Sequence, residues 1–176
     1  MTTERTGDLE RHIRDIPNWP KEGILFRDIT PLLGDAQAFR AGVEALGAPF
    51  QQAGVEYVAA VEARGFIFGA AVAAQLGAGF VPIRKAGKLP CETETVTYDL
   101  EYGTDTLEMH RDAVSVGAKV LMVDDLLATG GTMCAACELI EKVGAKIVGI
   151  AFVIELTDLH GRQKLARHKI HALISY

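Results

Sequence analysis

The chain has 176 residues, a net charge of −5 at pH 7 and three cysteines. This length suits a single domain with one hydrophobic core. The acidic balance argues against nucleic-acid binding, which usually needs a basic face, and an odd number of cysteines makes no disulfide framework. Because the sequence also lacks a signal-peptide core and an apolar run of about 18 residues, we expect a cytoplasmic protein without a membrane partner.

The N-terminal region combines a helical pattern with a short extended piece. The first apolar side chains recur at helical spacing, at Leu9, Ile13 and Ile16. Two prolines, Pro17 and Pro20, are expected to end this helix. Residues 23–31, with the sequence Gly-Ile-Leu-Phe-Arg-Asp-Ile-Thr-Pro, then form an extended segment between a glycine and a proline. Composition alone assigns Phe26 to the core.

Alternating strand and helix patterns occupy most of the remaining chain. Asp35 is a candidate N-cap for a helix that carries Phe39 and Val43 on one apolar stripe. Apolar runs predict buried strands at residues 57–61, 80–84, 120–123 and 146–154, and an edge strand at residues 170–176. A helical pattern occupies residues 66–76, a second follows the third strand, and Asp158 is a candidate cap for a short helix near the C-terminus. The alternation predicts one α/β domain with a roughly five-stranded parallel sheet flanked by helices.

The most informative stretch joins the strand at residues 120–123 to a helix through two acids and a glycine pair. Asp124 and Asp125 follow the apolar run, and Thr-Gly-Gly-Thr at residues 129–132 precedes the helix. Glycines let the backbone approach a ligand closely, and the unpaired N–H groups of a helix start attract anions. This pattern predicts a phosphate site whose acids accept hydrogen bonds from sugar hydroxyls. The alternative is a glycine turn beside a solvated acid pair; a Walker-type loop is excluded because no Gly-Lys-Ser/Thr follows.

Two further segments concentrate positive charge in this acidic chain. Arg64 follows the strand at residues 57–61 and precedes a helix, so it adds a cation to a second candidate anion site. Arg84, Lys85 and Lys88 fall within a short segment, as a polyanionic substrate would require. The structural alternative for Arg64 is a solvated arginine in a turn. For the segment with Arg84, Lys85 and Lys88 it is a solvated basic turn.

Residues 91–109 are predicted to form a β-ribbon. Residues 93–98 favour extended structure, Tyr102 belongs to a turn region, and residues 106–109 return to an extended pattern. Glu101, in the same turn region, would ordinarily be a surface carboxylate.

Several of these strings resemble those of type I phosphoribosyltransferases. The strand, acid pair and Ala-Thr-Gly-Gly-Thr at residues 120–132 are similar to the family's signature for phosphoribosyl pyrophosphate (PRPP). Phe-Arg-Asp-Ile-Thr-Pro at residues 26–31 resembles the N-terminal hood of adenine phosphoribosyltransferases. Further similar strings are Glu-Ala-Arg-Gly at residues 62–65, Arg-Lys-Ala-Gly-Lys-Leu-Pro at 84–90, Leu-Glu-Tyr-Gly at 100–103 and Glu-Leu-x-x-Leu-x-Gly-Arg at 155–162.

The resemblance implies the type I phosphoribosyltransferase fold in a single domain over residues 1–176, with a hood at residues 1–34 and a flexible β-ribbon lid at residues 85–106. It implies conversion of adenine and PRPP to AMP and pyrophosphate with Mg²⁺, which would be held mainly by PRPP and water. It also implies a homodimer in which Arg84 serves the neighbouring subunit's site. The cis peptide of the family would fall between Glu62 and Ala63.

On the purine side, the resemblance assigns roles to five residues. Phe26 would stack on the base, and the backbones of Leu25 and Arg27 would meet its hydrogen-bonding edge. Glu101 would act catalytically at N7 or N9 of the purine, with Tyr102 beside it.

On the PRPP side, the resemblance assigns cations to pyrophosphate and acids to the sugar. Arg64 would bind pyrophosphate and support catalysis, and Lys85 and Lys88 would also reach pyrophosphate. Asp124 and Asp125 would hold the ribose. The phosphate loop would comprise Leu127, Ala128, Thr129, Gly130, Gly131 and Thr132.

Two other functions remain open on the sequence. A phosphoribosyltransferase for another base would share the central motif, but a 6-oxopurine enzyme is expected to use a lysine near the base, and none follows Phe26 closely. A non-enzymatic PRPP-sensing regulator would keep the fold and bind nucleic acid, yet the sequence has neither a helix-turn-helix extension nor a basic face.

Overall fold

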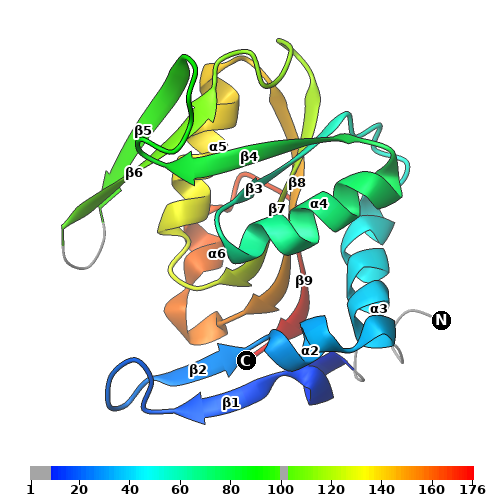
Figure 1. The fold of residues 1–176 in the computed structure, drawn as a ribbon, viewed down its shortest axis with the longest axis vertical. Helices are drawn as coiled ribbons and strands as arrows, with labels where there is room; N and C mark the ends of the chain where they lie inside the picture. The colour runs from blue at the N-terminus through cyan, green and yellow to red at the C-terminus, as the bar shows by residue number, and fades with distance from the viewer. Residues whose placement is uncertain (1–8, 100–102) are drawn as a thin grey trace.

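The computed structural model describes residues 9–99 and 103–176. Within these residues, strands form a seven-stranded sheet in the order β5-β6-β4-β3-β7-β8-β9 (Figure 1). Its parallel part consists of β3 (Tyr57–Val61), β4 (Gly79–Lys85), β7 (Lys119–Leu127), β8 (Lys146–Glu155) and β9 (Ile170–Ser175). The predicted five-stranded parallel sheet is therefore confirmed, and β9 lies at its edge as expected.

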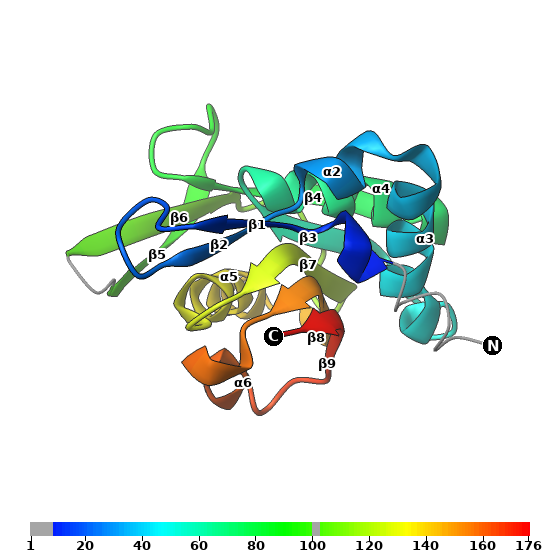
Figure 2. The same cartoon turned by 90° about the horizontal axis from the view of Figure 1, so that it is seen from below.

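Helices cover both faces of this sheet (Figure 2). They are α3 (Ala36–Gly47) and α4 (Arg64–Leu76) on one face and α5 (Gly131–Lys142) on the other. Because side chains alternate along a strand, Val120 and Met122 of β7 pack in the cluster with α5. Leu121 and Val123 pack in the cluster with α3 and α4. The nearly continuous apolar run of β7 thus reflects a strand that is buried on both faces.

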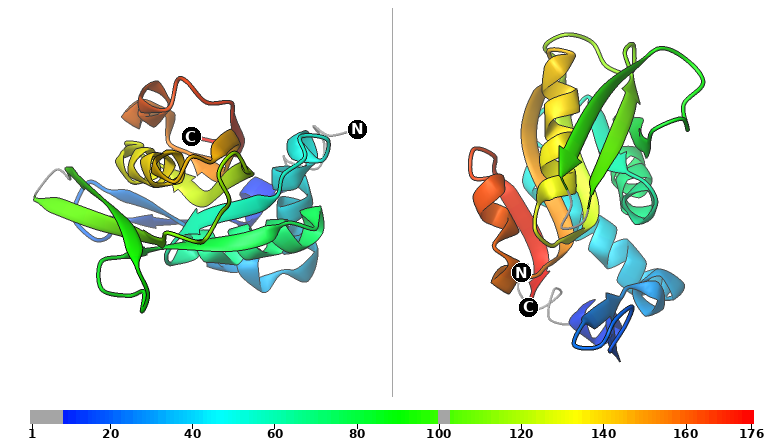
Figure 3. Two further views of the ribbon diagram at one scale, coloured as in Figure 1. Left: turned by 90° about the horizontal axis from the view of Figure 1, so that it is seen from above. Right: turned by 90° about the vertical axis from the view of Figure 1, so that its left-hand side faces the viewer.

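The predicted ribbon is formed by β5 (Thr93–Asp99) and β6 (Thr104–His110), which pair antiparallel. β6 also pairs with the last two residues of β4, so the ribbon extends the parallel sheet instead of standing apart from it. Figure 3 shows the ribbon projecting beyond the rest of the domain. Val96 and Leu107 pack in the cluster with α5 and anchor the ribbon there. The ribbon is confirmed, whereas its motion as a lid stays a prediction.

The hood corrects one expectation. Its elements are η1 (Glu10–His12), β1 (Arg14–Pro17), β2 (Leu25–Asp28) and α2 (Thr30–Gly34). The prediction that a helix runs from Leu9 through Ile16 is wrong beyond Leu9, because the 3₁₀ turn η1 and the strand β1 occupy the residues that follow. β1 pairs antiparallel with β2, and Arg14 donates a hydrogen bond to Asp28 at 2.6 Å. A partner distant in sequence therefore outweighs the local helical spacing.

The two predicted helix caps have different outcomes. Asp35 accepts hydrogen bonds from the N–H groups of Gln37 (3.0 Å) and Ala38 (2.8 Å), so its role as the N-cap of α3 is confirmed. Other short elements are η2 (Ala48–Phe50), η3 (Thr157–Leu159) and α6 (Gly161–Lys164). Asp158 lies inside η3, before α6 begins, so its predicted role as the cap of that helix is wrong.

Among the described residues, no helix is long and apolar enough to span a membrane.

Candidate active site

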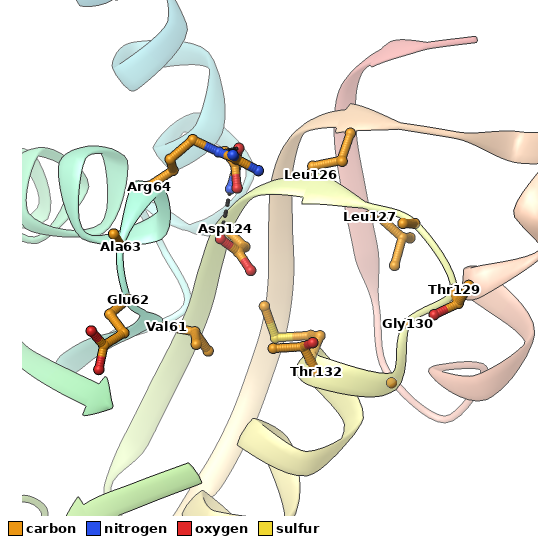
Figure 4. Close-up of a pocket in the computed structure, with 14 residues that line it drawn as sticks. Val61, Glu62, Ala63, Arg64, Asp124, Leu126, Leu127, Thr129, Gly130 and Thr132 are labelled. Atoms are coloured by element: carbon orange, nitrogen blue, oxygen red, sulfur yellow. Dashed lines mark hydrogen bonds and ion pairs between the residues drawn. The ribbon is translucent and has the colours of Figure 1, made fainter. Parts of the chain in front are cut away.

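A pocket of about 330 Å³ lies at the carboxyl ends of β3 and β7 (Figure 4). Its lining consists of Val61, Glu62, Ala63, Arg64 and residues 124–133. β3 leads through α4 to β4 on one side of this strand pair, while β7 leads through α5 to β8 on the other. The direction in which the chain crosses the sheet therefore reverses between β3 and β7. Open α/β sheets bind ligands at such a switch point.

The glycine loop joins β7 to α5 and forms one wall of the pocket. Gly130 has a φ of 78°, in the left-handed region that glycine tolerates, and α5 begins at Gly131. A Cβ atom at Gly130 would lie 2.6 Å from the carbonyl oxygen of Gly161, so this position has no room for a side chain. The lining includes the first turn of α5, whose N–H groups have no intrahelical partners. The loop therefore has the backbone of an anion site.

The two acids lie inside β7, because this strand continues to Leu127. The sequence had predicted its end at Val123, so the boundary is corrected. Oδ2 of Asp125 lies 2.5 Å from Nε of Arg64, and the Asp125 side chain is only 10% exposed. The N–H of Asp125 donates to Oδ1 of Asp124 at 2.9 Å. The Asp124 carboxylate is thus held by the backbone of β7, and the Asp125 carboxylate is held by Arg64.

The charge of the acid pair is only partly balanced. Burial, and then the negative charge of Asp125, raise the pKa of Asp124 well above its ordinary value. A Cβ atom at Gly65 would lie 2.6 Å from Oδ1 of Asp124, so the glycine near the start of α4 leaves space for this carboxyl. Arg64 pairs with Asp125. Asp124 is therefore the acid that gains most from a hydroxyl or a cation of a bound ligand.

The loop after β3 contains a cis peptide bond between Glu62 and Ala63, at the predicted position. Glu62 accepts a hydrogen bond from the N–H of Lys85 at 2.7 Å, and Oε1 lies 3.3 Å from Nε of Arg84. In Figure 4 the Glu62 side chain points away from Asp124. Glu62 therefore connects the pocket rim to the end of β4.

The basic segment at residues 84–88 lies next to the pocket lining, because Arg84 contacts Glu62 of that lining. Arg84 donates to the carbonyl of Lys88 at 3.2 Å in addition to its contact with Glu62. Nζ of Lys85 lies 3.1 Å from Asp105 of the ribbon. These cations are thus engaged with neighbouring groups of the same chain.

The hood approaches the pocket through Phe26. The guanidinium carbon of Arg64 lies 5.7 Å from the centroid of the Phe26 ring. Trp19 packs edge-on against the same ring, with the centroids 4.4 Å apart. Sequence reasoning did not single out Trp19, although it is the chain's single tryptophan and lies close to Phe26 in sequence. Leu25 and Arg27 flank Phe26 in β2.

The pocket brings together part of the predicted site. The predicted residues in its lining are Arg64, Asp124, Asp125, Leu127, Ala128, Thr129, Gly130, Gly131 and Thr132. Those outside the lining are Leu25, Phe26, Arg27, Arg84, Lys85 and Lys88. Glu101 and Tyr102 lie outside the described residues. Five further residues line the pocket and were not predicted as site residues: Val61, Glu62, Ala63, Leu126 and Met133. Their sequence signal is only their position in or beside the two motifs that carry Arg64 and Asp124.

Comparison with known proteins identifies the family. Residues 45–173 match the family model described as the phosphoribosyl transferase domain. A relative from Nitrosococcus oceani named adenine phosphoribosyltransferase is 54% identical over 168 residues, which cover 96% of this chain and 98% of the relative. This chain belongs to the adenine phosphoribosyltransferase family. It is therefore an enzyme of the pentosyltransferase class, as the sequence motifs predicted.

Solved structures of the family have the same fold. The adenine phosphoribosyltransferase of Thermoanaerobacter pseudethanolicus is 51% identical with a TM-score of 0.94, covering 97% of this chain and 99% of that chain. The Saccharomyces cerevisiae enzyme, solved in complex with D-2,5-dideoxy-2,5-imino-altritol 1,6-bisphosphate and adenine, is 40% identical. Its TM-score is 0.92, and the match covers 97% of this chain and 98% of that chain. The predicted type I phosphoribosyltransferase fold is confirmed.

Proposed function

We propose that the pocket transfers the phosphoribosyl group of PRPP to N9 of adenine, giving AMP and pyrophosphate. The observation that carries this proposal is that two acids, a glycine loop and Arg64 meet at the switch point of the sheet. Turnover with Mg²⁺, PRPP and a panel of purines tests it. Adenine should be the preferred base, and a preference for hypoxanthine would replace the proposal with a 6-oxopurine enzyme.

The walls of the pocket suit the parts of PRPP. The N–H groups at the start of α5 and the hydroxyls of Thr129 and Thr132 would donate to the phosphate of the sugar. Asp124 and Asp125 would accept hydrogen bonds from the ribose hydroxyls. Arg64 would bind pyrophosphate, because its planar guanidinium matches phosphate oxygens in two-point contacts.

The purine would lie between the hood and the ribbon. Phe26 would stack on its face, and the backbones of Leu25 and Arg27 would meet its edge. Glu101 would accept the N9 proton or bond at N7, with Tyr102 beside it. Glu101→Leu is expected to lower kcat by about 10²-fold or more, the usual scale for a positioned acid or base.

The chemistry requires stabilisation of a departing anion and of a positive sugar. As the bond between C1′ and pyrophosphate breaks, C1′ becomes oxocarbenium-like and N9 of adenine attacks it. Arg64, Lys85 and Lys88 would stabilise the charge on pyrophosphate, and bound Mg²⁺ would supply further charge stabilisation there. A ribbon that closes over the substrates would keep water from the reactive sugar.

The donor set fits a Mg²⁺ that arrives with its substrate. Across residues 9–99 and 103–176, no group of three or more His, Cys, Asp or Glu side chains could hold a metal ion. Asp124 and Asp125 nevertheless face one arginine in the lining, which leaves room for additional positive charge. We therefore propose that PRPP and water supply most ligands of the metal.

The assembly is proposed to be a homodimer in which Arg84 reaches the neighbouring site. Mixing Arg84→Ala subunits with Asp124→Asn/Asp125→Asn subunits tests this arrangement, because one site of the hybrid would recover a complete set of residues. Restored activity would support sharing. Absence of complementation in a verified heterodimer would make Arg84 a residue of its own subunit's site or a structural residue. A cytoplasmic location stays a prediction from the sequence.

A further inference from the structure

A second chain segment, between β8 and β9, supports the glycine loop from outside the pocket. The N–H of Leu156 donates to the carbonyl of Leu127 at 2.9 Å. A Cβ atom built on Gly161 would lie 2.2 Å from the carbonyl oxygen of Ala128 and 3.0 Å from the nitrogen of Gly130. The two backbones are therefore in direct contact, and the ribbon that passes beside Gly130 in Figure 4 belongs to this segment.

An ion pair next to this contact fixes the position of Gly161. Its neighbour Arg162 donates from Nε to Oε1 of Glu155 at 2.8 Å and from a terminal nitrogen to Oε2. Glu155 is the last residue of β8 and is only 5% exposed. Its carbonyl accepts the N–H of Tyr176 at 2.9 Å. Because a two-point contact fixes direction as well as distance, the sheet determines where Gly161 meets the loop.

Glu155 and Arg162 are not part of the pocket lining. A ligand in the pocket would therefore not touch this ion pair. A gain in folding stability does not by itself explain a buried ion pair at this position, because apolar side chains of similar volume often stabilise a protein as well or better. What the pair supplies is a defined geometry. A displacement of Gly161 passes directly to Gly130, because no side chain separates the two backbones.

We propose that Glu155 and Arg162 are positioning residues for the phosphate of the substrate, and that they act through Gly161 on the shape of the glycine loop. This inference rests on the proposed function, which gives the loop a phosphate ligand. An anion site requires several N–H groups to converge on one position, so a small displacement weakens every bond to the phosphate. Loss of the pair should therefore weaken phosphate-bearing ligands and leave binding of the base unchanged.

The test compares AMP with adenine, which carries no phosphate, by titration calorimetry on the whole protein. Arg162→Lys keeps the charge but loses the two-point contact. We expect it to raise the Kd for AMP by about 2- to 30-fold, the usual range for residues that act through a neighbour, with the Kd for adenine unchanged. Arg167→Lys is the matched control, because Arg167 pairs with Glu141 at 2.7 Å at the opposite end of α5.

Gly161→Ala tests the backbone contact without removing a charge and should weaken AMP binding at least as strongly. If Arg162→Lys fails to fold, Glu155→Gln and Gly161→Ala give the same comparison. Equal weakening of AMP and adenine, or unchanged AMP binding in the variants, would overturn the positioning role. Failure of the unaltered protein to bind AMP would instead overturn the proposed function, so the two failures are distinguishable.

Discussion

Nε of Arg64 lies 2.5 Å from Oδ2 of Asp125, which joins the start of α4 to β7 across the pocket. The two residues are 61 positions apart in the sequence. Under the proposed function, pyrophosphate would bind the same guanidinium. Because a guanidinium has five N–H donors and the Arg64 side chain is 48% exposed, its terminal nitrogens can reach pyrophosphate while Nε keeps its contact with Asp125.

Replacement of Arg64 tests its proposed contact with pyrophosphate. Arg64→Gln should lower kcat/KM for PRPP by about 10- to 150-fold, because a hydrogen bond to a charged group contributes about 1.5–3 kcal/mol. The KM for adenine should change little, and Arg64→Lys, which keeps the charge, should have an intermediate effect. Steady-state kinetics with each substrate varied in turn measures both quantities. Equal losses for PRPP and adenine would point to a structural role.

Neutralising both acids of β7 should separate binding from folding. Asp124→Asn combined with Asp125→Asn should lower PRPP affinity and turnover by at least about 10-fold, because two acceptors for sugar hydroxyls become amides. The fold should survive, since asparagine has nearly the same volume as aspartate. Calorimetry with PRPP and circular dichroism give the two readouts. Wild-type kinetics in a folded double variant would remove the ribose assignment.

Asp124 should make stability depend on pH. Burial, and then the charge of Asp125, raise its pKa in the folded state. The stabilising contribution of its proton is complete below the unfolded value of about 3.8 and is lost as pH rises through the folded pKa. Asp124→Asn removes this loss, so its Tm should exceed that of the unaltered protein by a margin that grows as the pH rises above about 4. Each kcal/mol of difference in stability corresponds to about 2–4 °C in a chain of this size.

Thermal unfolding without ligands at several pH values measures this effect. Asp112→Asn is the control, because Asp112 lies on the exposed surface. A difference in Tm between Asp124→Asn and the unaltered protein that stays constant across the pH range would contradict the raised pKa.

The hood contacts Tyr176, the residue that follows β9, through a cation–π contact. The guanidinium carbon of Arg27 lies 3.5 Å from the centroid of the Tyr176 ring. Because Arg27 is next to Phe26, Tyr176→Leu should displace the hood and raise the KM for adenine by about 2- to 5-fold, from about 0.5–1 kcal/mol for such a contact. The KM for PRPP should not change. Tyr176→Phe retains the ring and should behave like the unaltered protein; a matching rise there would exclude the ring contact as the cause.

Limited trypsin digestion tests the predicted lid. The N–H of Lys85 is bonded to Glu62 and its Nζ pairs with Asp105, whereas Lys88 lies beyond β4. Trypsin should therefore cut first after Lys88. PRPP with Mg²⁺ should slow this cut more than adenine, because the cations of the segment are proposed to bind pyrophosphate. Mass spectrometry of the digest identifies the cut, and equal rates with and without ligands would indicate a fixed ribbon.

Local sequence was sufficient for much of the site. The apolar run before Asp124 and the glycine pair after it specify a buried strand, a turn and a helix start without reference to other parts of the chain. The strand before Arg64 and the N-cap Asp35 follow from equally short patterns. These features depend on interactions over a few residues, so the sequence by itself determined them.

Only the tertiary structure decided which distant groups meet. The helical spacing near the N-terminus predicted a helix, but β2 offers β1 a set of ladder hydrogen bonds that no local pattern anticipates. Arg64 pairs with Asp125, and Arg84 pairs with Glu62. Both partners lie far from their arginine in the sequence. Sheet order and the space left by packing select such partners, because a side chain binds whatever charged or polar group the fold brings within its reach. The acids, cations and glycines were visible in the sequence, and the order of the strands decided how they pair.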